Sequence, residues 1–475
     1  MTQPEQQKFA LPTLTAMVVG SMVGAGIFSL PQTFGRVTGG LGALIAWAIA
    51  GAGMLMLAFV FQTLARRKPE LDAGVYAYAK AGFGNYPGFL SALGYWTVCC
   101  LGNVSYWVLI KSTLGALFPI FGDGNTVAAV ALSSVGLWLF HFLILRGVKQ
   151  AAFINTVVTV AKIIPILIFL IFVAFGFKAD IFAVNFHGGP GLEGAGLFAQ
   201  VRGTMLVTVF VFVGIEGASV YSRYARRRED VGLATLLGFL GVLCLLVLVT
   251  MLSYGVMLRP DLASLRNPSM AGVLAAVVGP WGAVFVSVGL IVSVLGAYLS
   301  WSLLAAEVLF SAAKKESMPA FLAAENRNGV PFIALWLTNL LIQLFLIVTL
   351  FAEEAFLLAL KLTSSMILLP YLLTGAYALK LALSGEGYRA NEGRRGDLVR
   401  AGLATLYAAG LVYAGGLKFL LLSLVIYAPG SVLFVIAQRE RGRQVFTPVE
   451  LALFMAVGAG AVLAVFGLAT GRIAI

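Results

Sequence analysis

The stretch "GSMVGAGIF" (Gly20–Phe28) lies inside the first long apolar segment of the chain. Three glycines fall within seven residues there. Each glycine in a helix interior costs about 1 kcal/mol relative to alanine. A segment that is apolar enough to cross a bilayer is therefore weakened in its middle, so we expect a helix that breaks at this point.

The composition indicates a membrane protein. Of the 475 residues, 60% are hydrophobic and only 11% are charged. Apolar runs of about 20 residues recur along the chain, and each can cross a bilayer core roughly 30 Å thick. We predict an all-α polytopic membrane protein with about twelve or thirteen transmembrane helices and no signal peptide. The expected spans are 11–34, 39–65, 86–118, 126–145, 151–176, 200–222, 231–257, 273–311, 331–352, 355–381, 399–414, 417–438 and 447–470.

The few cysteines and histidines argue against a metal site or a disulfide framework. Cys99, Cys100 and Cys244 all fall inside apolar segments, and His141 and His187 are far apart. Neither set has the spacing of zinc ligands. We therefore expect no metal and no cofactor.

The positive charge is distributed as a topology signal. The formal net charge of +12 could suggest a nucleic-acid partner. However, about two thirds of the 32 Lys and Arg residues fall in alternate connections such as "RRKPE", "SRYARRRED" and "QRERGRQ". By the positive-inside rule, these connections and the N-terminus are cytoplasmic. We expect a multi-pass protein of a bacterial inner membrane, with no nucleic-acid partner and an oligomeric state that the sequence leaves open.

A second interrupted span matches the first. "FVFVGIEGAS" (Phe210–Ser219) in span six also combines closely spaced glycines with a polar group. Paired interrupted spans at equivalent positions are typical of transporters built from inverted repeats. A broken helix offers free N–H groups to a carboxylate and free carbonyls to an ammonium group. Close helix packing through Gly20 and Gly24 is the alternative for the first segment taken alone. The matched placement favours a binding site.

Ionisable residues inside the spans are candidate functional groups, because a charge at membrane depth is costly. Glu216 can balance a cationic substrate or take a proton, unless it is a buried acid satisfied by backbone N–H groups. Lys162 lies near the middle of span five, as either a charged structural strut or a carrier of a coupling proton. Lys111 and Lys361 lie nearer span ends, where we expect their side chains to reach the membrane surface.

Several stretches together resemble the amino acid–polyamine–organocation superfamily, and within it the basic amino acid/polyamine antiporters. The likeness covers most of spans one to ten, and "VYSRYARRRED" is similar to the span-six exit of members that exchange arginine for ornithine. It implies a LeuT-like 5+5 inverted repeat with broken helices in spans one and six. The transporter core would be residues 1–395, with repeats at about 11–176 and 200–381, and residues 396–475 would add further helices. The stretches are "GSMVGAGIF", "DAGVYAYAKAGFG", "GYWTVCCLGN", "GIEGAS" and "WSLLAAEVLFSAAKKESMP".

The resemblance implies how an amino acid would be held at the two breaks. Ala25 and Gly26 correspond to the residues that bind the α-carboxylate. The backbone carbonyls of Met22, Phe210 and Val213 correspond to those that bind the α-amino group. Two departures stand out, because a small hydroxyl residue is common at Ala25 and a tryptophan is common at Phe210. The first removes one contact with the carboxylate, and the second leaves an aromatic cap without an N–H donor.

The distal cation of the substrate would lie against Trp301, close to Cys99 and Asn103. A cation over an indole face gains about 2 kcal/mol when it is desolvated. Trp301 lies too deep in its span for an interfacial tryptophan, whereas Asn103 could equally make a simple interhelical hydrogen bond. Tyr95 matches an aromatic gate, and Glu216 matches an acid tied to gating and proton sensing. A span-five lysine such as Lys162 takes the place of a sodium ion in several superfamily members, and arginine/agmatine-type exchangers often lack it.

The expected function is one-for-one exchange of arginine for ornithine, with lysine as a further candidate substrate. Both substrates carry one positive charge, so the exchange moves no net charge. A proton-coupled importer of lysine, histidine or arginine with the same fold is the nearest alternative. An enzyme is not expected, because no nucleophile, base or metal ligands converge at one depth. A channel is less favoured, because neither a charged ring nor a carbonyl filter is readable.

Overall fold

The computed structural model describes residues 10–71, 74–147, 151–189, 191–192, 194–216, 228–352, 354–388 and 393–473, and for 151–160 and 228–229 it describes the backbone alone. Within these residues the regular secondary structure is entirely helical. In chain order the helices are α1 (Leu11–Met22), η1 (Ala25–Ser29), α2 (Leu30–Gly35), α3 (Gly40–Arg67), α4 (Val75–Phe83), α5 (Asn85–Gly115), η2 (Pro119–Phe121), α6 (Val127–Leu145), α7 (Ala151–Phe175), α8 (Ala179–Phe186), α9 (Leu197–Phe212), α11 (Arg228–Ser253), α12 (Arg259–Ser264), α13 (Ser269–Val278), α14 (Pro280–Lys314), η4 (Ala320–Ala323), α15 (Phe332–Val348), α16 (Ala355–Ser384), α17 (Arg394–Arg439) and α18 (Pro448–Ala469).

The protein is a multi-pass helical membrane protein. Among the described residues, eight helices are long and apolar enough to cross a membrane, or ten if each of two bent pairs forms one span. One bent pair is Leu11–Met22 with Ala25–Gly35, which differ in direction by 51°. The thirteen expected spans exceed this number partly because α9 and α15 have only 16 and 17 residues. The stretch that follows α9 after Glu216 lies outside the described residues, as do Asp72, Ala73 and most of "VYSRYARRRED".

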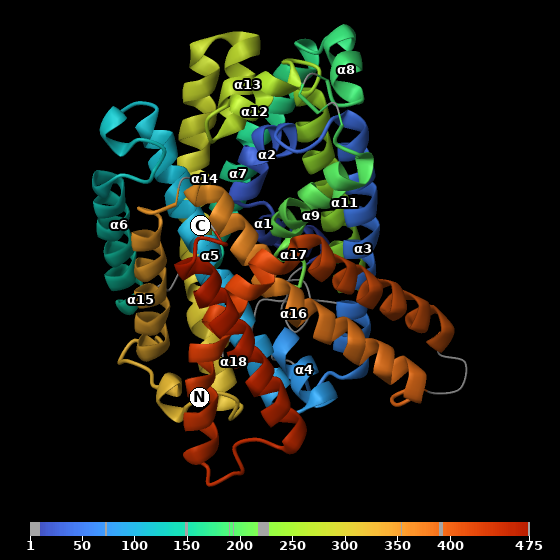
Figure 1. Ribbon diagram of the computed structural model, residues 1–475, viewed down its shortest axis with the longest axis vertical. Helices are drawn as coiled ribbons and strands as arrows, with labels where there is room; N and C mark the ends of the chain where they lie inside the picture. Colours follow the sequence, from blue (N-terminus) through green and yellow to red (C-terminus); the bar gives the residue numbers. More distant parts are fainter. Residues whose placement is uncertain are drawn as a thin grey trace.

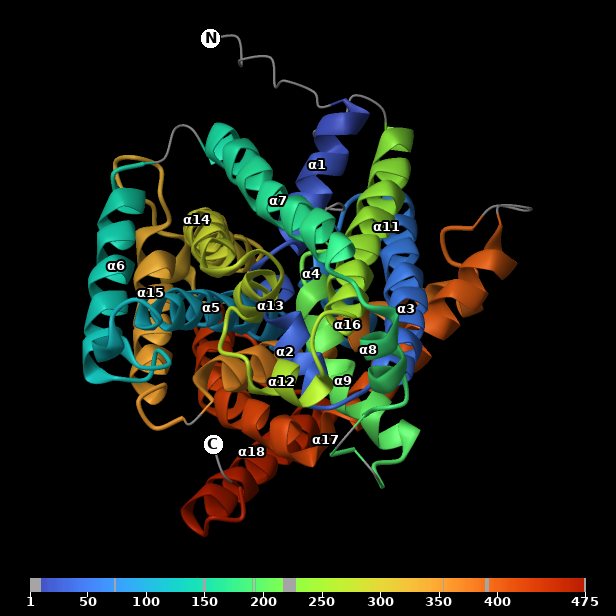
Figure 2. The ribbon, with the colours of Figure 1, turned by 90° about the horizontal axis from the view of Figure 1, so that it is seen from above.

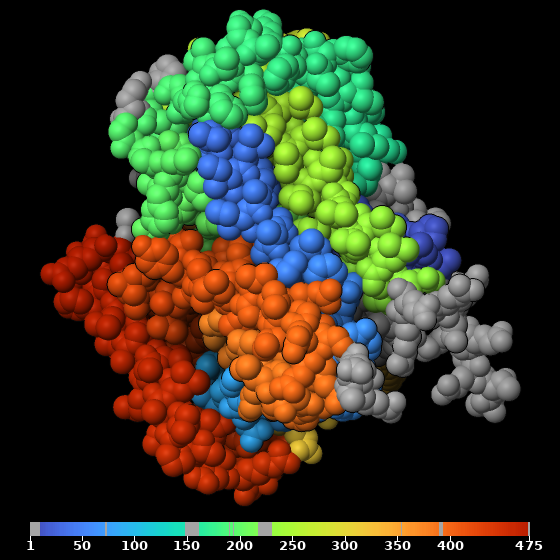
Figure 3. All heavy atoms as spheres, turned by 90° about the vertical axis from the view of Figure 1, so that its right-hand side faces the viewer, coloured from blue at the N-terminus to red at the C-terminus, as the bar shows by residue number. Residues whose placement is uncertain are grey.

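The long helix α17 contains two of the expected spans. It has 46 residues, which corresponds to a length of about 70 Å, more than twice the thickness of a bilayer core. Gly416 interrupts it with a non-helical φ of 75°. The interruption falls between the spans expected at 399–414 and 417–438. Figure 3 shows α16 to α18, in orange and red, gathered in the lower part of the molecule.

The expected span at 273–311 is wrong at its start. The chain forms a separate helix, α13, and then reverses at Gly279, whose φ is +87°. Pro280 follows as the first residue of α14. A positive φ and a residue without an N–H group together end one helix and start the next. The apolar run hid this turn because both helices are apolar.

Helix α5 passes through the middle of the molecule. In its most apolar window 94% of the residues are buried, against 28% in α17 and α18. Figures 1 and 2 show it surrounded by α14, α15, α16 and α4. The expectation that Lys111 on this helix reaches the membrane surface is wrong. Its side chain is fully buried and its Nζ donates a hydrogen bond to Thr349 Oγ1 at 3.2 Å, because α15 covers this end of α5.

Candidate functional site

The first apolar segment breaks where its glycines predicted. Helix α1 ends at Met22, Gly24 is extended with a φ of −122°, and η1 starts at Ala25. The first N–H groups of a helix have no partner inside it. Within the described part of the chain, the amides of Gly24, Ala25 and Gly26 donate no backbone hydrogen bond to another element. These amides are therefore available to an anion.

The second break meets the first. Helix α9 ends at Phe212, and Gly214 has a φ of +109°. Ser21 Oγ donates a hydrogen bond to the carbonyl oxygen of Gly214 at 3.0 Å. A Cβ atom on Gly214 would lie 2.4 Å from the carbonyl oxygen of Ser21, so only glycine fits this crossing. Segments almost 200 residues apart in sequence are thus joined through their unwound backbones.

The carboxylate of Glu216 lies just behind this junction. Tyr95 and Tyr371 donate hydrogen bonds to its two oxygens at 2.8 and 2.7 Å, and the amide of Gly214 donates another at 3.2 Å. The structure thus brings together Tyr95 and Glu216, which the sequence analysis singled out separately. The sequence analysis did not identify Tyr371 on α16, because nothing in the local sequence "LLPYLLTG" indicates a hydrogen-bond partner 155 residues away. The cluster ties α5, α9 and α16 to one buried acid.

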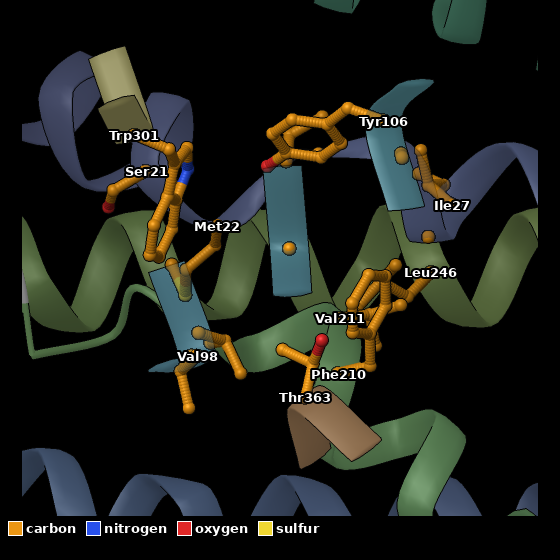
Figure 4. A pocket seen from close by; sticks show the side chains of 16 residues that line it. Ser21, Met22, Ile27, Val98, Tyr106, Phe210, Val211, Leu246, Trp301 and Thr363 are labelled. Atoms are coloured by element: carbon orange, nitrogen blue, oxygen red, sulfur yellow. The ribbon is translucent and has the colours of Figure 1, made fainter. Parts of the chain in front are cut away.

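A pocket opens in front of the two breaks. It measures about 450 Å³, including space open to solvent. Figure 4 shows its side chains, with Trp301 from α14 on one side and Phe210 and Thr363 on the other. No described lining residue carries a charged side chain. Six of the eight substrate-binding residues expected from the sequence line it: Met22, Ala25, Gly26, Phe210, Val213 and Trp301.

The other two expected residues lie outside the lining. Cys99 is fully buried behind it. Asn103 Nδ2 donates a hydrogen bond to Ser302 Oγ at 3.2 Å, next to Trp301 in sequence. This is the interhelical hydrogen bond that the sequence analysis kept as the alternative for Asn103.

Three lining residues with hydroxyl groups, Ser21, Tyr106 and Thr363, were not among the binding residues expected from the sequence. Tyr106 lies seven residues after Cys99 on the same helix, so a two-turn periodicity could have placed it on the same face. Thr363 had no comparable local signal.

Phe210 separates the pocket from a larger outer cavity. Its ring makes an edge-to-face contact with Phe356, with centroids 6.4 Å apart. Phe356 lines a cavity of about 1180 Å³, again including space open to solvent, whose walls include Arg36, Arg266, Asp123, Glu354 and Lys361. Arg36 pairs with Glu354, and Arg266 pairs with Asp123. The charged side chains of the outer cavity are thus separated from the central pocket by the rings of Phe210 and Phe356.

Lys162 reaches the first break from α7. Its side chain is 3% exposed, and Nζ donates a hydrogen bond to the carbonyl oxygen of Gly20 at 3.0 Å. The carbonyls in the last turn of a helix lack partners within the helix. Lys162 therefore satisfies one carbonyl that the end of α1 at Met22 leaves free.

Comparisons with known proteins agree with this arrangement. The amino acid permease family model matches residues 9–461. An arginine/ornithine antiporter of Pseudomonas aeruginosa is 56% identical over 99% of both chains. A putative arginine/ornithine antiporter of Escherichia coli K12 is 45% identical over 91% of this chain and 93% of its own. An L-lysine transport protein of Corynebacterium glutamicum is 44% identical over 98% of this chain and 96% of its own. A family match of this extent, with relatives this similar along almost the whole length, means that the chain belongs to the amino acid permease family.

Proposed function

We propose that the protein exchanges arginine for ornithine across a bacterial cytoplasmic membrane by alternating access. The observation that carries this proposal is a pocket formed where two broken helices meet, with an indole on one wall and no charged side chain in its described lining. Such a pocket recognises the zwitterionic end of an amino acid through backbone groups and a distal cation through an aromatic face. The name of the Pseudomonas relative supports the choice of substrates.

The proposed roles follow the two ends of the substrate. The amides of Ala25 and Gly26 hold the α-carboxylate, and the carbonyls of Met22, Phe210 and Val213 hold the α-amino group. The guanidinium or ammonium group of the substrate lies over Trp301, and Cys99 and Asn103 are assigned to the same end of the substrate.

The groups around the pocket couple binding to movement. Tyr95 and Glu216 gate the pocket, because their hydrogen bond crosses between α5 and the second break. Lys162 acts as a strut on the first break through its bond to Gly20.

The proposed fold is the LeuT-like 5+5 inverted repeat, with twelve or thirteen membrane crossings and a cytoplasmic N-terminus. Repeats at about 11–176 and 200–381 form a core within residues 1–395, and residues 396–475 add the C-terminal helices. The boundary falls in the first turn of α17.

Exchange of two substrates with the same charge is indifferent to the membrane potential. A cation that crossed alone would gain or lose about 2.3 kcal/mol per 100 mV. The test uses purified protein in liposomes that are either preloaded with ornithine or empty, with uptake of labelled arginine as the readout. Uptake only into preloaded vesicles, unchanged by an imposed potential, is the expected result.

Proton-coupled import of lysine, histidine or arginine is the second candidate. It is favoured by the buried Lys162 and by the lysine-transporting relative. Equal uptake into empty vesicles that rises with an inward proton gradient would replace exchange with this function. Absence of arginine uptake under every condition would refute the choice of substrate.

A further inference from the structure

Three side-chain hydroxyl groups line the central pocket, and they differ in what they bind. Ser21 Oγ donates to the carbonyls of Val18 and Gly214, at 2.8 and 3.0 Å. Thr363 Oγ1 donates to the carbonyl of Ala359 at 2.7 Å. The hydroxyl of Tyr106 makes no hydrogen bond with any described residue, although the side chain is only 5% exposed. A buried phenol with a free donor in a binding pocket calls for a partner.

The Tyr106 hydroxyl lies beside the first break. Its oxygen is 3.0 Å from the position that a Cβ on Gly24 would occupy. Gly24 directly precedes the amides of Ala25 and Gly26, which are free to bind an anion. In Figure 4 the ring of Tyr106 comes from α5 and turns its hydroxyl inward, toward the side of Trp301. The phenol hydroxyl and the residues that carry these amides therefore line the same part of the pocket.

We propose that the Tyr106 hydroxyl donates a hydrogen bond to the α-carboxylate of the substrate and makes the transporter selective for amino acids over decarboxylated amines. This inference rests on the proposed function. Ala25 has no hydroxyl of its own, so the side-chain donor at the break comes from α5 instead of from the broken helix. Hydrogen bonds from an O–H group to a carboxylate are short and strong, and more so in a desolvated site.

A purely structural role would have a different signature. The Tyr106 ring covers Gly24, with two ring carbons 3.7 Å from the same Cβ position. Phenylalanine preserves this packing and removes only the hydroxyl. If packing were the whole role, Tyr106→Phe would leave all ligands unaffected. If the hydroxyl binds the carboxylate, the same variant weakens only ligands that carry one.

The experiment measures binding of arginine and of agmatine, which is arginine without its carboxylate, to the purified full-length protein in detergent. Tyr106→Phe is expected to weaken arginine binding roughly tenfold and to leave agmatine binding unchanged, as expected for the loss of one hydrogen bond to a charged group. The matched control is Tyr86→Phe on the same helix. It removes a hydroxyl that pairs with Ser431 at 2.9 Å, outside the pocket. The control is expected to keep the ratio of the two affinities.

A rescue variant tests in a second way whether a hydroxyl group at the break binds the carboxylate. Ala25→Ser in the Tyr106→Phe background supplies a hydroxyl at the break and is expected to restore most of the arginine affinity. Unchanged arginine binding in Tyr106→Phe, or equal weakening of arginine and agmatine, would overturn the inference. Wild-type protein that neither binds nor exchanges arginine would instead refute the proposed function.

Discussion

The central pocket and the outer cavity lie on opposite sides of one aromatic contact, and they use opposite chemistry. The central pocket has no charged side chain in its described lining, which consists of unwound backbone, apolar side chains, an indole and hydroxyl groups. The outer cavity, beyond Phe210 and Phe356, carries three cationic and two acidic side chains. Four of these are partly exposed and paired with each other.

The difference follows from the dielectric environment. Deep in the protein a fixed charge is costly, and oriented dipoles can bind both ends of a zwitterion without that cost. Near water, charged side chains are inexpensive but their interactions are screened and weak. We therefore expect changes at the breaks to have large effects on transport and changes at the outer charges to have small ones.

Gly214→Ala is expected to have the largest effect. The new methyl group would lie 2.4 Å from the carbonyl of Ser21, at a φ of +109° that disfavours any residue except glycine. Exchange should fall roughly 100-fold or more, because the two breaks can no longer meet. The rate of arginine–ornithine exchange in liposomes measures this loss, and size-exclusion chromatography checks that the variant is folded. Gly241→Ala on α11 is the matched control, since its Cβ would meet nothing within 4 Å. Equal activity of the two variants would disprove a tight junction.

Trp301→Leu is expected to have the second largest effect. Loss of the indole face removes about 2 kcal/mol of cation–π attraction, so the KM for arginine should rise roughly 30-fold. Trp281→Leu, on the same helix but 50% exposed, should leave KM unchanged. Trp301→Phe, which keeps a weaker aromatic face, should fall between wild type and Trp301→Leu. A KM in Trp301→Leu equal to that of wild type would remove the indole from the cation site.

Glu216→Gln tests the acid behind the junction. A neutral amide cannot accept from Tyr95, Tyr371 and the Gly214 amide as a carboxylate does. The loss of charge-assisted hydrogen bonds should slow turnover roughly tenfold, with a smaller change in KM. Tyr371→Phe should reproduce part of this loss. Additive effects in the double variant, measured as a mutant cycle, would argue that the two groups do not act together.

The outer charges should matter least. Arg36→Gln removes an ion pair with Glu354 in which both side chains are more than a third exposed. Such pairs contribute at most about 1 kcal/mol, so exchange should change less than about fivefold and the change should shrink at high salt. Exchange assays at low and high ionic strength measure it. A loss as large as that of Trp301→Leu would mean that the outer cavity also binds substrate tightly.

Local features of the sequence predicted the two breaks and several of the residues that line the pocket. The glycines at positions 24 and 26 predicted the first break, and Gly214 the second. Trp301 was predicted to be deep in its helix, and it lines the pocket. These predictions succeed because backbone freedom, helix length and hydropathy depend on residues that are neighbours in the sequence.

Tertiary packing decided the rest. Tyr371 hydrogen-bonds to Glu216 because α16 packs against α5 and the second break. The packing of helices around α5 also places the Tyr106 hydroxyl at the first break and buries Lys111 under α15. The turn at Gly279 was hidden by two apolar helices that read as one run. By itself the sequence determined that the chain is a helical membrane protein and where its first apolar segment breaks, because these depend on transfer free energy and local backbone energetics. Which polar side chains share a buried acid or face a pocket depends on contacts between helices far apart in the chain, and only the tertiary structure decided that.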